Sequence, residues 1–380
     1  MKKFVELIQR LHKERYSVVI DKIVAEKIPV AFLSVNSLQY AINVANNLRE
    51  QNVNVTNVIT ILPPPYTDLV SDFKIIHIDE ISKLYPRPEY IFTIDINSAR
   101  LAAKKIPDSK ILSILYVKTD FIYETFMEHL TDLQEVYESL IDETSRRTFC
   151  CYWFDIIANR FSDYVFANTT HYFVEGFFPK DGGIVIDCGA CDGFTATKFA
   201  GLGYKVYGFE MDKINFEIAK KLAAEKGFIV ENFGLGSYTH EMKYTHVEGN
   251  IGASKLNSDG TETARIITLD SYISEKRLPS VDFIKMDVEG AELDVLRGAA
   301  DTIARFKPIL ALSAYHKFDD LWTLMNFVKS VRSDYEFALR QYGETERDLS
   351  FINKNTLEAL YNLGLEPDTR GPSEIVLFAR

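Results

Sequence analysis

Residues 184–210 read IVIDCGACDGFTATKFAGLGYKVYGFE, and this stretch predicts the architecture of the C-terminal half of the chain. An apolar strand, Ile184–Ile186, ends in Asp187, and the loop CGACDG leads into the helical segment Phe194–Ala200. A second apolar strand, Lys205–Phe209, ends in Glu210. This order predicts a βαβ unit, in which an acid about 20 residues after the first strand typically binds the ribose hydroxyls of a nucleotide. We therefore expect a nucleotide-type cofactor at this loop, the alternative being an ordinary strand–turn–helix without a ligand.

The spacing of the loop separates two classes of cofactor. A dinucleotide fingerprint, GxGxxG, would place a pyrophosphate at the helix N-terminus. Here the spacing is DxGxxxG, with Asp187 opening the loop and Asp192 inside it. Carboxylates repel a pyrophosphate but attract the sulfonium and α-ammonium groups of S-adenosyl-L-methionine (SAM). The loop therefore predicts SAM rather than NAD.

Length and composition limit the classes of protein to which this chain can belong. A chain of 380 residues with 47% hydrophobic and 26% charged residues is typical of a globular protein with two domains. The first residues, MKKFVELIQRLHKERY, predict an amphipathic helix and not a signal peptide. No apolar run reaches the roughly 18 residues that a membrane span needs. The net charge of −11 disfavours binding to a nucleic-acid backbone. We expect a cytoplasmic protein without a nucleic-acid partner.

The four cysteines do not form a recognisable metal or redox motif. Cys150 and Cys151 are adjacent, and Cys188 and Cys191 lie in the cofactor loop as CxxC. A zinc site would need a second CxxC or a histidine pair, and the sequence contains neither. We therefore predict no metal site, and thiols that suit a reducing compartment.

The N-terminal part, residues 1–118, alternates between apolar strands and helical segments, which predicts a small parallel sheet with crossover helices. Its first strand-to-helix turn, Leu33–Ser37, contains no glycine. Because a nucleotide phosphate needs close approach of the backbone at that turn, we expect a degenerate Rossmann-like domain that does not bind a dinucleotide tightly. Residues 119–170 are expected to form a helical connector, followed by the main domain at 171–380. Expected strands are Pro29–Val35, Val55–Leu62, Lys74–Ile78, Tyr90–Ile94 and Lys110–Tyr116.

The main domain continues the same βαβ rhythm after the cofactor strands. The polar, glycine-bearing stretch 242–270 predicts a hairpin insertion. The last two strand candidates, Tyr335–Leu339 and Glu374–Ala379, lack crossover helices, which indicates an antiparallel edge to an otherwise parallel sheet. Further strands are expected at Phe228–Asn232, Val281–Met286 and Ile309–Leu312.

A second cluster of polar residues follows two of these strands. Residues 281–292, VDFIKMDVEGAE, end a strand at Asp287, and Glu289 and Glu292 are expected to open the next helix. The following strand runs into SAYHKFDD, which contains His316. Since ligands bind beyond the carboxyl ends of parallel strands, Asp287 and His316 are candidate catalytic residues on the edge that holds the cofactor. The alternatives are favourable helix-terminus charge for Glu292 and a purely structural role for His316.

These motifs together resemble the FkbM family of SAM-dependent methyltransferases. The resemblance rests on DCGACDG, GFE, IKMDVEGAE and SAYHKFDDLW, and it covers roughly residues 140–330. It implies a Rossmann-like class I methyltransferase fold and O-methylation of a hydroxyl on a sugar, glycan or polyketide acceptor. It also implies that SAM contacts the loop residues Asp187, Gly189, Ala190, Asp192 and Gly193, that Glu210 binds the ribose and that Asn232 and Gly234 border the adenine. Asp287 and His316 would face the acceptor hydroxyl.

Two other functions stay open at this point. One is a non-catalytic module that binds SAM or a nucleotide and recruits a partner. The other is a nucleotide-sugar epimerase or dehydrogenase built on the first domain, which the missing glycine turn disfavours. Residues 343–373 are also expected to form an extra loop and helix that the family pattern lacks.

Overall fold

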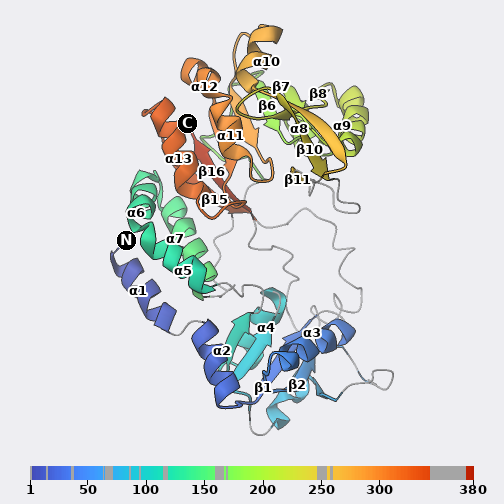
Figure 1. Cartoon of the computed structure of the whole chain (residues 1–380), viewed down its shortest axis with the longest axis vertical. Helices are drawn as coiled ribbons and strands as arrows, with labels where there is room; N and C mark the ends of the chain where they lie inside the picture. The colour runs from blue at the N-terminus through green and yellow to red at the C-terminus, as the bar shows by residue number, and fades with distance from the viewer. Residues whose placement is uncertain are drawn as a thin grey trace. The chain divides into compact units, whose positions relative to one another are not determined.

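The computed structural model describes residues 2–13, 16–35, 38–62, 64, 72–84, 87–93, 96–113, 119–158, 167, 170–245, 255–256, 260–342 and 374–380. They form two compact units (Figure 1). The first is mainly Met1–Leu130 and Arg147–Val165, and the second comprises Thr131–Arg146, Phe166–Tyr342 and Ser373–Arg380. The connector proposed at 119–170 is thus divided between the units. The expected extra segment 343–373 lies outside the described residues.

The first unit contains a five-stranded parallel sheet with the strand order β3-β2-β1-β4-β5, as the alternating pattern predicted. Successive residues of β1 point to opposite faces, so Val30 and Phe32 enter one apolar cluster while Ala31 and Leu33 enter another. The helices and strands are α1 (Lys2–Lys13), α2 (Tyr16–Ala25), β1 (Val30–Ser34), α3 (Leu38–Glu50), β2 (Val55–Thr60), β3 (Lys74–His77), the 3₁₀ helix η1 (Ile78–Lys83), β4 (Tyr90–Thr93), α4 (Ile96–Lys105), β5 (Lys110–Ser113) and α5 (Thr119–Glu128). Part of the glycine-free turn, residues 36–37, lies outside the described residues.

The second unit is built on a seven-stranded sheet with the order β15-β16-β14-β13-β6-β7-β8. Strands β8, β7, β6, β13 and β14 are parallel, whereas β16 runs antiparallel to both β14 and β15. The predicted antiparallel edge is therefore confirmed. Helix α7 (Glu143–Ala158) begins in this unit, but its residues from Arg147 onward belong to the first unit. The other main elements are α6 (Leu130–Ser139), β6 (Ile184–Cys188), α8 (Phe194–Gly201), β7 (Lys205–Phe209), α9 (Lys213–Lys226), β8 (Ile229–Glu231), α10 (Leu269–Lys276), β13 (Phe283–Met286), α11 (Glu292–Arg297), α12 (Ala300–Phe306), β14 (Ile309–Ser313), α13 (Asp320–Val331), β15 (Phe337–Tyr342) and β16 (Glu374–Ala379).

The expected hairpin insertion is part of a separate small sheet with the order β11-β10-β12-β9. Strands β10 and β12 pair antiparallel, and β9 joins β12 in parallel. The bounds are β9 (Gly234–Leu235), β10 (His240–Thr245), β11 (Lys255–Leu256) and β12 (Glu262–Ile267).

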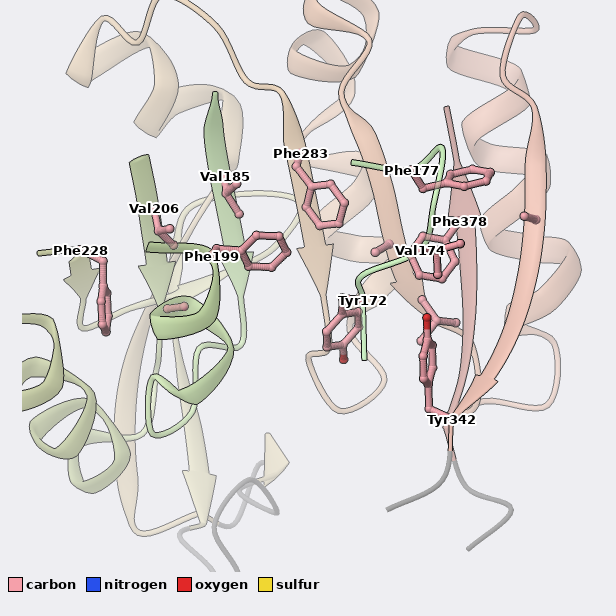
Figure 2. Packing of buried hydrophobic residues seen from close by; sticks show 14 of the residues in the cluster. Tyr172, Val174, Phe177, Val185, Phe199, Val206, Phe228, Phe283, Tyr342 and Phe378 are labelled. Atoms are coloured by element: carbon pink, nitrogen blue, oxygen red, sulfur yellow. The ribbon is translucent and has the colours of Figure 1, made fainter. Parts of the chain in front are cut away.

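An apolar cluster packs on the main sheet (Figure 2). Phe199 of α8 packs against Phe283 of β13, with ring centroids 5.2 Å apart. Phe177, from the segment before β6, packs against Phe378 of β16 at 5.5 Å. These contacts bring the chain before β6 over the sheet and place Tyr172 in the same cluster.

Two predicted element boundaries differ from the structure and affect the site. Strand β6 continues through Cys188, so Asp187 lies inside the strand and is fully buried. Helix α11 begins at Glu292, so Glu289 precedes it and adopts a φ of 54° rather than opening the helix. The reason is the turn at Glu289 and Gly290, both of which have positive φ.

The strand order determines where a ligand can bind. Strand β6 lies between β7 and β13, so the chain winds outward from it in two directions. In an open α/β sheet such a switch point forms a crevice at the carboxyl ends of the strands. The residues that follow β6, β7, β13 and β14 therefore lie on one edge of the sheet. In the part of the chain that the structure describes, no helix combines the length and apolarity that crossing a membrane requires.

Candidate cofactor and acceptor site

In the loop after β6, four backbone N–H groups donate hydrogen bonds to other groups of the protein. The N–H groups of Gly189 and Ala190 both donate to the carbonyl oxygen of Phe209, at 3.0 and 2.9 Å. Cys191 N–H donates to Glu210 Oε2 at 2.8 Å, and Gly193 N–H donates to Ala190 at 2.8 Å. A pyrophosphate is normally bound by a row of such N–H groups at a helix N-terminus. Because four of these donors are already bonded, the loop fits a cofactor without a pyrophosphate, which agrees with the prediction of SAM.

Glu210 is a buried acid at the end of β7, with 7% of its surface exposed. Besides the bond from Cys191, its Oε1 accepts from Asp212 N–H at 2.7 Å. An ionised carboxylate has about four lone-pair sites, so acceptor capacity remains for a diol. Burial raises the pKa of the Glu210 carboxyl to about 7, against the opposing effect of the two backbone N–H groups. The carboxyl therefore changes charge close to neutral pH.

Of the two residues expected at the adenine end, Asn232 contacts the backbone of this acid and Gly234 lies near Met211, the next residue. The Asn232 side-chain amide donates to the carbonyl oxygens of Glu210 and Met211, at 3.0 and 3.3 Å. Asn232 is exposed. Through these two hydrogen bonds, its amide holds the backbone that follows β7. Gly234 begins β9, where an added Cβ would approach Ile266 Cδ1 to 2.7 Å.

Asp187 makes a different contact from the one that the sequence suggested. Its carboxylate is fully buried and lies 3.0 Å from the ammonium of Lys285, a buried residue of β13. Lys285 Nζ also donates to the carbonyl oxygen of Gly189 at 2.7 Å. Burial raises the pKa of Asp187 and the ammonium opposes this, while the carboxylates of Asp187 and Asp287 raise the pKa of Lys285 despite its burial. The structure thus pairs Asp187 with Lys285 beneath the loop.

Gly189 is required by the neighbouring strand. Its φ is 80°, and a Cβ at this position would overlap the carbonyl group of Asp287. This glycine therefore sets the close approach between the cofactor loop and the residue that ends β13.

Gly189→Ala is expected to destabilise the second unit more than Gly203→Ala does. Both glycines have positive φ, but nothing lies within 4 Å of an added Cβ at Gly203. The left-handed conformation should cost about 1–2 kcal/mol in either variant. The overlap at Gly189 should add about 1–3 kcal/mol. Urea unfolding of both variants measures the difference, and equal losses would contradict the packing argument.

Asp287 is the centre of the second cluster. Tyr172 donates to its Oδ2 at 3.1 Å and Tyr315 donates to its Oδ1 at 3.3 Å. His316 Nε2 lies 3.6 Å from Oδ1. Burial opposes ionisation, but the Lys285 ammonium and His316 hold the pKa of Asp287 below its usual value. Its side chain keeps 25% exposure, so an ionised oxygen can reach a ligand.

His316 is oriented by a buried acid. Its Nδ1 lies 2.9 Å from Glu292 Oε1, which also accepts from Val288 N–H at 3.0 Å. Since a carboxylate can only accept, this contact places a proton on Nδ1 and turns Nε2 toward Asp287 and Glu289. Burial disfavours the imidazolium, yet Glu292 and Asp287 raise the pKa of His316 above its usual value. Glu292 thus does more than supply charge to a helix terminus.

Donor atoms of Asp287, Glu292 and His316 lie within 4.8 Å of one another, which is a spacing that a metal ion can bridge. The hydrogen bond between Nδ1 and Glu292 Oε1 already accounts for the shortest of these separations. His316 and Glu292 therefore form a hydrogen-bonded pair within this group. The two loop cysteines are free thiols, and burial raises the pKa of Cys188 above its usual value and that of Cys191 to about 12.

The structure places His316 beside Asp287 and Glu210 beside the cofactor loop, and three residues that were not expected there contact the same region. Lys285, Tyr172 and Tyr315 all contact Asp187, Asp287 or the loop. A signal existed for Lys285, because a lysine inside the apolar run FIKM is unusual in a central strand. No pattern near Tyr172 indicates its contact, since 115 residues separate it from Asp287.

Comparisons with known proteins show which families and folds this chain is similar to. The model of the methyltransferase FkbM domain matches residues 187–341. A hexuronic acid methyltransferase, AglP, of Haloferax volcanii is 26% identical over 102 residues, which are 26% of this chain and 42% of that protein. The crystal structure of methyltransferase FkbM from Methylobacillus flagellatus KT covers 99% of both chains with a TM-score of 0.67 at 18% identity. This last similarity shows a shared fold.

The matched methyltransferase domain also indicates which cofactor the protein uses. The bonded N–H groups of the loop and the buried acid at Glu210 fit SAM, and the methyltransferase domain that contains them uses SAM as its methyl donor. Residues 187–341 of this chain therefore match the methyltransferase FkbM domain.

Proposed function

We propose that this protein transfers a methyl group from SAM to a hydroxyl oxygen of a sugar, glycan or polyketide-like small molecule. The observation that carries the proposal is the position of Asp287 and the oriented imidazole of His316. Both lie at the carboxyl edge of the sheet that also holds the cofactor loop. Asp287 follows β13, the direct neighbour of β6, so an acceptor beside Asp287 is also beside the cofactor.

The proposed cofactor contacts follow from the loop. Glu210 accepts the ribose hydroxyls, and Asn232 and Gly234 border the adenine. Gly189, Ala190, Asp192 and Gly193 line the methionine part. The carboxylate of Asp187 is buried beneath the loop, so it does not contact this part of SAM itself. It pairs with Lys285, which donates a hydrogen bond to the Gly189 carbonyl of the loop.

In the proposed reaction, Asp287 and His316 have different roles. SAM, when bound, supplies an electrophilic methyl group. The ionised carboxylate of Asp287 accepts a hydrogen bond from the acceptor hydroxyl and orients its oxygen. As the oxygen bonds to the methyl group, this same proton passes from its hydrogen bond with Asp287 to the neutral Nε2 of His316, which lies 3.6 Å from Asp287 Oδ1. Glu292 holds Nδ1–H and stabilises the imidazolium that forms. Orientation of the acceptor oxygen toward the methyl group should supply much of the remaining rate enhancement.

A relative of this chain indicates the chemical class of the acceptor. The partly matched Haloferax volcanii protein is a hexuronic acid methyltransferase, which favours a carbohydrate acceptor here as well.

Transfer of a labelled methyl group tests the proposal directly. The purified protein is incubated with methyl-labelled SAM and a panel of monosaccharides, glycolipids and polyketide alcohols, and the product is examined for a methyl ether. A product methylated on nitrogen or carbon would contradict O-methylation. A protein that binds SAM but transfers no methyl group would instead support a non-catalytic recruiting module.

Glu210→Ala is expected to weaken SAM binding by at least about tenfold, because hydrogen bonds to a charged group contribute about 1.5–3 kcal/mol each. Calorimetry measures the change. Glu225→Ala, at an acid near the end of α9, is the control and should bind normally. Unchanged affinity in a folded Glu210→Ala variant would remove Glu210 from the ribose site.

The same acid predicts how SAM affinity depends on pH. The pKa of Glu210 is raised to about 7 in the free protein, so the carboxyl is protonated below that pH and ionised above it. Ribose recognition needs the ionised form, so affinity should rise with pH between about 6 and 8, with proton release on binding. Glu210→Gln should abolish this dependence.

A further inference from the structure

We propose that Tyr172 is a positioning residue for the reaction, which holds the carboxylate of Asp287 in the orientation that meets the acceptor hydroxyl. The inference rests on the proposed function, because it requires Asp287 to face the acceptor. Tyr172 lies before residues 187–341, which the FkbM domain model matches. The segment that carries it would therefore complete a site whose other residues belong to the domain.

The backbone of Tyr172 is in an unusual conformation. Its φ is 67°, in the left-handed region that bulky side chains rarely adopt. Arg277 and Lys307 have similar angles, but both are helix C-caps, where this conformation is common. Tyr172 is instead the third residue of a turn in which Phe173 N–H donates to the Thr170 carbonyl, a position where positive φ occurs but where glycine is the usual residue. Such a conformation persists where the surrounding structure holds it, often at functional sites.

The side chain of Tyr172 is held by packing on its ring. The residue is 4% exposed and belongs to the main apolar cluster (Figure 2). Its ring stacks on the ring of His171, with centroids 4.0 Å apart and planes 12° apart. The Lys285 ammonium lies 5.7 Å from its centroid. His171 in turn is held by Glu374 of β16, at 2.9 Å. These contacts therefore fix the position of the Tyr172 hydroxyl group.

The group that this hydroxyl contacts is the carboxylate of Asp287. The Tyr172 hydroxyl donates to Oδ2 at 3.1 Å, and Tyr315 donates to Oδ1 at 3.3 Å. Burial and the charge of Asp287 raise the pKa of Tyr172 well above its usual value, so the hydroxyl keeps its proton and stays a donor. With one donor on each oxygen, the plane of the carboxylate is fixed, and its remaining lone pairs point in defined directions. Tyr172 thus acts on the acceptor through Asp287.

Tyr172→Phe tests the role because it removes the hydroxyl and keeps the ring. We expect the turnover number to fall at least about tenfold, since a hydrogen bond to a charged group is lost. The affinity for SAM should remain unchanged. Tyr335→Phe is the matched control, because the buried Tyr335 hydroxyl donates to the Pro308 carbonyl at 2.7 Å, outside the site. If both variants lose the same activity, the positioning role is wrong.

A double variant tests whether Tyr172 acts through Asp287. In an Asp287→Asn background, adding Tyr172→Phe should cause little further loss of turnover, because the carboxylate that Tyr172 positions is already absent. An equal loss in both backgrounds would show that Tyr172 acts independently and would overturn the proposal.

A titration that needs no acceptor separates this proposal from the proposed function. The pKa of Asp287 can be followed by ¹³C NMR in the wild type and in Tyr172→Phe. The titratable groups around Asp287 include Lys285 on β13, Asp187 on β6, Glu292 on α11, Tyr315 and His316 after β14, and His171 and Tyr172 before β6, while Glu289 acts on His316. Loss of the hydroxyl should raise this pKa, and an unchanged value would overturn the proposal. If the wild type methylates no acceptor, the proposed function fails, and the titration still decides whether Tyr172 holds Asp287.

Discussion

Replacing either Asp287 or His316 is expected to lower the turnover number for methyl transfer by at least about 100-fold, because a general base typically contributes about 10²–10⁴ to a rate. The variants are Asp287→Asn and His316→Ala. Both residues lie on the acceptor side, after β13 and β14, so the affinity for SAM should change little. Asp287→Asn keeps the shape of the side chain but removes the charge that orients the hydroxyl and helps to raise the pKa of His316.

The dependence of turnover on pH provides a second readout for His316. Its pKa is raised above the usual value, and a proton acceptor must be neutral. Turnover should therefore increase as the pH rises through this raised pKa, and the increase should occur at lower pH in Glu292→Gln, where the supporting charge is lost.

Turnover and melting temperature must be measured on the same samples. If His316 only holds its loop, His316→Ala will lower the melting temperature and leave the turnover of folded molecules nearly intact. His240→Ala is the control, because His240 contacts the Tyr238 carbonyl in the small sheet. Normal turnover in folded Asp287→Asn would contradict the proposed mechanism at its centre.

Lys285→Met is expected to destabilise the second unit by about 3–5 kcal/mol, because removal of one partner from a buried ion pair leaves an uncompensated charge. Lys285 and Asp187 have side chains that are 5% and 0% exposed, at a separation of 3.0 Å. The variant also loses the bond to the Gly189 carbonyl, so the cofactor loop should bind SAM more weakly. Urea unfolding and calorimetry measure the two effects.

A second substitution separates charge from packing. Asp187→Leu combined with Lys285→Met removes both charges, and most of the lost stability should return, since apolar replacements of a buried pair are often neutral or better. SAM affinity should not return with it, because the bond to the loop is still absent. Arg297→Met breaks an exposed pair with Asp294 and should cost at most about 1 kcal/mol. A double variant no more stable than Lys285→Met would refute the ion-pair argument.

The local pattern of the sequence was sufficient for the framework. Apolar runs of strand length, separated by helical segments, predicted both sheets, and the missing crossover predicted the antiparallel edge formed by β15 and β16. Short-range chemistry also predicted the cofactor, because Asp192 and the DxGxxxG spacing are incompatible with a pyrophosphate. Asp287 and His316 were predicted to share an edge because both follow parallel strands.

What the sequence could not decide is which long-range partners the buried polar groups take. Asp187 was expected at an open loop end, but one more residue of strand buries it against Lys285, 98 positions away along the chain. Tyr172 and Asp287 likewise meet only because the chain before β6 packs over the sheet. Periodicity reports which face of an element is buried, whereas a buried charge or hydroxyl must find a partner wherever the completed fold provides one. The sequence alone therefore determined the sheet edge and its cofactor, and the tertiary structure decided how Lys285, Glu292 and Tyr172 hold the reacting groups on that edge.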